Sequence, residues 1–147
     1  MVGTIDDKRN YYLLAKAGAK HLVLTYSIIN SQIVHMFPLS AAFTEDLIPL
    51  TCYLDPQTGG LVGLAASASG TPTTTFYMEI NPSSGAVYTL KKLSISLTAS
   101  AFDPVERRVY LADTAGNLYT ISLDSHILSP PMPFGLNIVS LAWSNTF

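Results

Sequence analysis

Two short stretches decide the fold of this chain: residues 53–56 (YLDP) and residues 101–104 (AFDP), in each of which an apolar pair precedes Asp-Pro. The two aspartates are 48 residues apart, and a weaker copy, residues 4–7 (TIDD), places its first aspartate 49 residues before the next. A period of about 20–50 residues is the signature of a repeat protein. The chain is therefore expected to contain three copies of one structural unit.

Each copy continues in the same order, with a polar turn and then an apolar strand that ends near an alanine. Residues 118–123 show period-two alternation of apolar and polar side chains, which is typical of a β-strand. Clusters of Asp, Asn, Gly, Ser and Pro separate such segments and predict turns. Residues 40–47 carry the one weak helix signal and are expected to form a loop. An all-β chain with four short strands in each repeat follows from this pattern.

The expected strands are residues 2–5, 11–15, 21–27 and 32–37 in the first repeat, 48–54, 61–66, 75–80 and 86–90 in the second, and 96–102, 108–112, 118–123 and 126–134 in the third. Three prolines interrupt the last of these, which suits an outer edge strand because proline cannot donate to a ladder.

Parts of the second and third repeats resemble blades of β-propellers from the quinoprotein, NHL and YWTD groups. The resemblance rests on residues 55–65, 76–87 and 102–119, which carry Asp-Pro, an apolar strand and, in the last case, Gly-Asn-Leu-Tyr. The first 45 residues share it only weakly. It implies an architecture and says little about activity, because propellers host many unrelated functions. A β-trefoil, which also has three four-stranded repeats, is the alternative.

Residues 137–144 resemble the opening strand of each repeat and form an expected thirteenth strand. A trefoil has no place for this strand, which favours the propeller. We expect one repeat domain over residues 1–147, with blades at about 2–40, 47–93 and 95–134 and the extra strand at 137–144.

Propeller rings have roughly 4–8 blades, so three blades leave apolar sheet faces uncovered. Such faces mark association surfaces. Two copies would complete a six-bladed ring as a homodimer, with the C-terminal strand crossing to the partner. Ile138, Val139, Leu141 and Trp143 are then the candidate interface residues. A competing explanation is that the chain is a fragment of a longer ring.

The composition excludes several classes of protein. Hydrophobic residues make up 48% of the 147 and charged residues 12%, which predicts a packed core rather than disorder. A net charge of −2 gives no basic footprint for nucleic acid, and no apolar run is long enough to span a membrane. The N-terminus does not resemble a signal peptide. The compartment stays unknown, with the cytoplasm favoured, and Cys52 is expected to be a buried thiol without a disulfide.

No constellation of residues predicts catalysis. His21, His35 and His126 lack the spacing of a metal pair, and Asp124 with Ser125 is explained by turn chemistry. Asp55 and its repeat equivalents are expected to cap tight turns. No catalytic, cofactor or metal residue is therefore assigned.

A non-enzymatic binding or protein-interaction module that self-associates is the favoured function. Its partners would be a second copy and an unidentified protein or small molecule. The alternative is a hydrolase or lactonase-like propeller, which would hold a ligand or divalent cation at its channel mouth.

Overall fold

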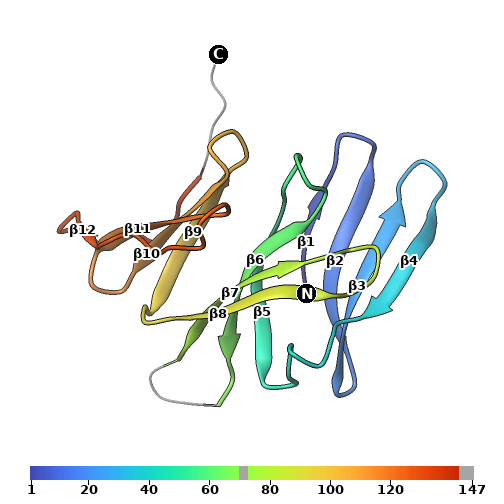
Figure 1. The fold of residues 1–147 in the computed structure, drawn as a ribbon, viewed down its shortest axis with the longest axis horizontal. Helices are drawn as coiled ribbons and strands as arrows, with labels where there is room; N and C mark the ends of the chain where they lie inside the picture. The colour runs from blue at the N-terminus through green and yellow to red at the C-terminus, as the bar shows by residue number, and fades with distance from the viewer. Residues whose placement is uncertain (70–72, 143–147) are drawn as a thin grey trace. The chain divides into compact units, whose positions relative to one another are not determined.

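A computed structural model describes residues 1–69 and 73–142 of the chain. These residues form twelve β-strands and no helix, arranged in three four-stranded antiparallel sheets (Figure 1). Each sheet is a meander in which strands adjacent in sequence are hydrogen-bonded neighbours. Three propeller-like blades, as the sequence predicts, are thus present.

The first sheet runs in the order β1-β2-β3-β4, with β1 at Val2–Ile5, β2 at Asn10–Ala17, β3 at Lys20–Ser27 and β4 at Gln32–Pro38. Gly18, with a φ of 62°, turns β2 into β3 because glycine enters the left-handed region without steric cost. A register shift beside Thr25 and Tyr26 marks an irregularity in the pairing of β3 with β4.

The second sheet contains β5 (Leu47–Leu54), β6 (Leu61–Ser67), β7 (Thr75–Ile80) and β8 (Val87–Leu93), in that order. Its third turn is built as the sequence predicts: Asn81 accepts a hydrogen bond from the backbone of Ser83, and Gly85 has a φ of 74°. The loop at residues 39–46 before this sheet is not helical, as expected.

The third sheet contains β9 (Leu97–Asp103), β10 (Arg108–Asp113), β11 (Asn117–Ser122) and β12 (Met132–Pro133). Its outer strand is much shorter than the segment 126–134 that the sequence predicts. The prolines in that segment lack an N–H and cannot sustain a ladder, so only one bridge, between Ile121 and Leu128, and the two-residue β12 form.

The chain divides into two compact units, Met1–Leu93 with the first two sheets and Ser94–Phe147 with the third. Within the first unit, β5 contacts both β1 and β2. Buried side chains of the two sheets form one hydrophobic cluster there, which includes Leu14, Val23, Leu61, Met78 and Ile80. The first two blades therefore pack against each other through apolar faces.

Register makes the three blades equivalent residue by residue. In each blade, the residue just before the turn aspartate pairs with the first or second residue of the next strand: Ile5 with Tyr11, Leu54 with Leu61, and Phe102 with Val109. Tyr11, Leu61 and Val109 thus hold the same place in their blades. The next residue along each strand, Tyr12, Val62 or Tyr110, points to the opposite face.

Candidate interaction surfaces

The β1–β4 sheet has one covered face and one open face. Leu14 and Val23 lie on the covered face, where they are 1% and 0% exposed and belong to the cluster shared with the second sheet. Paired residues of an antiparallel sheet share a face. Cross-strand pairing therefore places the neighbours Leu13 and Leu24 together on the other face.

This open face is apolar across all four strands. Its strand residues, taken from the pairing register, are Gly3, Ile5, Tyr11, Leu13, Ala15, Ala17, Lys20, Leu22, Leu24, Tyr26, Ile33, Met36 and Pro38. Lys20, at one end, is the only charged residue among them. Ile5, Tyr11 and Met36 are 52%, 38% and 56% exposed. Large exposed apolar surfaces are commonly sites of association, so this face is a candidate interaction surface.

The outer strand β4 borders this face and contains no Asp, Glu, Lys or Arg. Ile33, Val34 and Met36 are all exposed along it. Natural sheets commonly protect an outer edge with charges, as Lys91 and Lys92 do on β8. The unprotected edge is consistent with a surface that another molecule covers.

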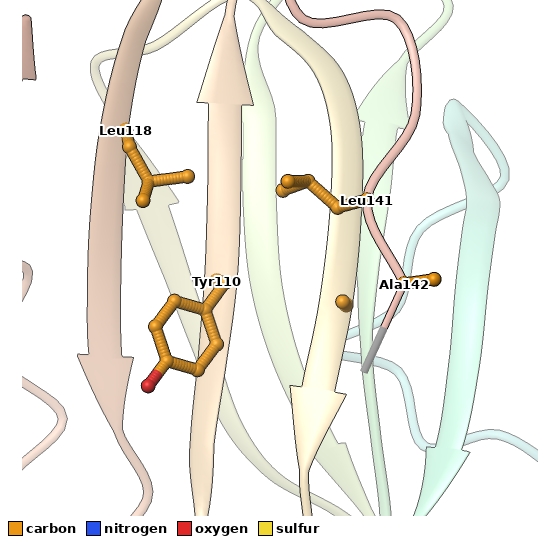
Figure 2. Close-up of a pocket in the computed structure, with 5 residues that line it drawn as sticks. Tyr110, Leu118, Leu141 and Ala142 are labelled. Atoms are coloured by element: carbon orange, nitrogen blue, oxygen red, sulfur yellow. The ribbon is translucent and has the colours of Figure 1, made fainter. Parts of the chain in front are cut away.

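A second apolar surface lies on the β9–β12 sheet. A cavity of about 210 Å³ is lined by Ala101, Tyr110 and Leu118 from the sheet and by Leu141 and Ala142 from the C-terminal segment. In Figure 2 the side chain of Leu141 points toward that of Leu118. The C-terminal segment therefore lies over one face of this sheet and leaves a cavity between itself and the sheet.

Two contacts hold the C-terminal segment in place. The Thr98 hydroxyl donates a hydrogen bond of 2.8 Å to the Ile138 carbonyl. Gly116, with a φ of 79°, lies so close to Leu136 that an added Cβ would be 2.7 Å from its carbonyl oxygen. Glycine at this turn thus permits both the backbone conformation and the close approach.

The predicted interface residues lie in this segment. Ile138 is half-buried, Leu141 lines the cavity, and Val139 is 77% exposed. Trp143 lies outside the described residues, as does the end of the predicted strand 137–144. Residues 137–142 form no strand within the single chain, so their pairing with a second copy stays a prediction.

The aspartates after the opening strands lie in tight turns and accept hydrogen bonds there. Asp55 accepts from the backbone of Gln57 and the hydroxyl of Thr58, and Asp103 accepts from the backbones of Val105 and Glu106. These contacts are those of capping residues.

Asp6 belongs to a motif that recurs at Asp113. Each aspartate accepts hydrogen bonds from the backbone and side chain of an asparagine four residues on and from the hydroxyl of a tyrosine six residues on, at Asn10 and Tyr12 or at Asn117 and Tyr119. The Asp-x3-Asn-x-Tyr spacing at residues 6–12 and 113–119 is the sequence signal for this motif.

Hydrogen bonding shifts the pKa values in both motifs. Burial alone would raise the pKa of Asp113, but the bonds from Asn117, Tyr119 and Ala115 outweigh it and lower that pKa. The pKa of Tyr119 is raised, by burial and by its bond to Asp113. Asp6 and Tyr12 show the same directions. The carboxylates are thus committed to local structure.

The remaining candidates for chemistry are dispersed. His21 is buried, with neither ring nitrogen hydrogen-bonded, and packs edge-on against Phe43 at 4.8 Å between ring centroids. Asp124 pairs with Arg107. Burial raises the pKa of the Cys52 thiol to about 12, so it is not a nucleophile at neutral pH.

Within the described residues, no group of three or more His, Cys, Asp or Glu side chains is placed to hold a metal ion. The same part of the chain has no helix that meets the length and hydropathy needed to cross a bilayer.

No protein-family model and no curated protein matches the chain. The four-stranded blades therefore rest on the sequence repeats and on the structure.

Sequence reasoning anticipated uncovered faces at the ends of the repeat but did not assign residues to them. The signal lies in residues 11–15 (YYLLA), which are apolar at both odd and even positions. A strand with apolar residues at both odd and even positions is suited to burial on both faces. Recognising this would have marked Tyr11 and Leu13 as candidate interface residues.

Proposed function

We propose that this chain is a non-enzymatic interaction module of the β-propeller type that associates with itself. The observation that carries the proposal is the open apolar face of the β1–β4 sheet. On this face the side chains of Ile5, Tyr11 and Met36 are exposed to solvent. Covering it would remove these side chains from water at a gain of roughly 25 cal/mol for each Å² of apolar surface.

The number of blades suggests how two copies would associate. Two copies supply six blades, within the roughly 4–8 of propeller rings. A two-fold dimer of this kind has two identical junctions, each between the first blade of one copy and the third blade of the other. The sequence resemblance to quinoprotein, NHL and YWTD blades supports treating the three sheets as blades of such a ring.

A hydrolase or lactonase-like enzyme would need converging carboxylate, histidine or nucleophilic side chains. The carboxylates of Asp6, Asp55, Asp103 and Asp113 are instead engaged by their own turns. No observation within the described residues favours this alternative.

The test is the solution mass of the purified chain, measured by light scattering over a range of concentrations. We expect a mass near twice 15.9 kDa. The double substitution Ile5→Lys/Met36→Lys, called the open-face variant, is expected to shift the chain to monomer, because burying two unpaired ammonium groups in an apolar interface is unfavourable.

The matched control is Val105→Lys/Ile127→Lys. These side chains are 65% and 66% exposed, but they lie in a turn and a loop of the Ser94–Phe147 unit rather than on the open face. The control should remain dimeric. A wild-type chain that is monomeric at every concentration would contradict the proposal.

A further inference from the structure

The structure points to a specific partner surface for the open face. We infer that it docks on the Tyr110 face of the third sheet of a second copy, together with that copy's C-terminal segment, residues 136–142. This inference rests on the proposed self-association and names the two surfaces that meet.

The segment that follows the first blade packs on one side of it. Beyond β4 the chain continues into β5, which contacts β1 and β2. Leu47 and Cys52 of β5 lie in one buried cluster with Leu14, on the covered face of the first sheet. The covered face is thus the side on which the following segment packs.

The same placement recurs after the third blade. Tyr110 is equivalent to Tyr12, and pairing puts Ala101 and Thr120 on its face. The C-terminal segment lies on this face, since Leu141 lines a cavity with Tyr110. It therefore lies on the side of the third sheet that corresponds to the side β5 covers on the first.

One face of a blade is covered by the blade before it. In the second sheet, Leu61 faces the first sheet within the shared cluster. Its equivalent in the first sheet is Tyr11, on the open face. By the repeat, the open face is the side that a preceding blade would cover. In the first sheet, the face that covers the following blade is the one with Tyr12 and Leu14. The equivalent face of the third sheet is the one with Tyr110 and Ala112.

Side-chain sizes agree with this junction. Leu14 and Leu61 belong to one cluster at the junction inside the chain. Their equivalents at the inferred junction are Ala112 and Tyr11, a smaller residue on one side and a larger one on the other. Such compensation keeps the total volume suitable for close packing.

The C-terminal segment is apolar on the side that faces away from its own sheet. Leu136 and Val139 are 69% and 77% exposed, whereas Ile138 and Leu141 are partly buried and Leu141 lines the cavity over the sheet. A segment with apolar side chains on both sides is suited to cover on both sides. The open face of a second copy would provide the missing cover.

The cavity beneath the segment fits a side chain better than a free ligand. Its volume of about 210 Å³ lies below the roughly 300–1,000 Å³ of most ligand sites. Its lining is almost wholly apolar. We assign it as the seat of an apolar side chain from the open face of the second copy.

The experiment is a complementation test between two double variants. One is the open-face variant, Ile5→Lys/Met36→Lys. The other is the tail variant, Leu136→Lys/Val139→Lys, which changes only strongly exposed side chains. Each variant alone has a charged surface in both junctions of its homodimer, so each is expected to be monomeric, with dimerisation at least about tenfold weaker than that of the wild type.

Mixing the two variants restores one junction. The unchanged open face of the tail variant meets the unchanged Tyr110 face and tail of the open-face variant. We therefore expect a 1:1 complex with a mass near twice 15.9 kDa only in the mixture. Sedimentation velocity with one variant carrying a fluorescent label measures this directly, and circular dichroism confirms that both variants keep their β structure.

The outcomes separate the two proposals. A tail variant that remains fully dimeric on its own would overturn the inference while leaving self-association through the open face intact. Two monomeric, folded variants that do not associate when mixed would also overturn it. A monomeric wild-type chain would instead overturn the proposed function.

Discussion

The two faces of the β1–β4 sheet are made of the same strands, yet only one is covered within the chain. The covered face includes polar side chains such as His21, Thr25 and Ser27, whereas the open face is largely apolar. Leu14 and Val23 are buried against the second sheet, whereas Tyr11 and Met36 are substantially exposed. The difference shows that apolar character alone does not tell whether a face is core or interface. What separates the two is the presence of a neighbouring blade.

Neighbouring leucines give the sharpest version of this comparison. Leu14→Ala on the covered face is expected to reduce the free energy of unfolding by about 2–5 kcal/mol, because it removes buried methyl groups and leaves a cavity. Leu13→Ala on the open face should cost the monomer clearly less, since Leu13 is only half-buried. Urea unfolding at low protein concentration measures both.

A Leu13→Ala loss as large as that of Leu14→Ala would contradict the distinction between the faces. The same two variants also differ in association. We expect Leu13→Ala to weaken dimerisation more than Leu14→Ala does, which light scattering across a concentration series would reveal.

Neighbouring tyrosines test the hydrogen bond on the covered face. The Tyr12 hydroxyl donates to Asp6 at 3.1 Å. Removing it by Tyr12→Phe is expected to reduce the free energy of unfolding by about 0.5–1.5 kcal/mol. Tyr11→Phe, which keeps the apolar ring on the open face, should change it by less. Equal effects of the two substitutions in thermal unfolding would count against a stabilising role for the bond.

The covered face also contains a titratable group, which gives the smallest expected effect. Burial, reinforced by the charge of Lys16, lowers the pKa of His21 below its ordinary value of 6.5. As the pH falls below about 6.5 the unfolded chain takes up a proton that the folded chain resists, so this group makes the free energy of unfolding fall.

His21→Leu is expected to flatten the dependence of stability on pH between about 7 and 5. Urea titrations at several pH values compare the variant with the wild type. An unchanged slope in the variant would show that His21 takes up its proton equally well in the folded and unfolded chain.

The sequence predicted most of the local structure. The strands at residues 2–5 and 75–80 have the expected bounds, and the others start or end within a few residues of prediction. The exceptions are the proline-rich β12 and residues 137–142, which form no strand. Period-two alternation and turn residues are local signals, so they can be recognised without tertiary information. The Asp-Pro copies likewise predicted turn-capping aspartates.

The candidate site was less predictable. Exposure of Ile5, Tyr11 and Met36 depends on the pairing register of four strands and on which side the second sheet packs. The position of residues 136–142 depends on contacts between Thr98 and Ile138, 40 residues apart. Such long-range choices leave little trace in a local pattern.

The sequence by itself therefore determined that this chain forms three repeats of short antiparallel strands, because side-chain alternation and turn chemistry act over a few residues. Only the tertiary structure decided which apolar face becomes core and which stays open. The physical reason is that burial is a property of neighbours: Leu13 and Leu14 have the same transfer free energy, and the packing of β5 against one face and not the other gives them different environments.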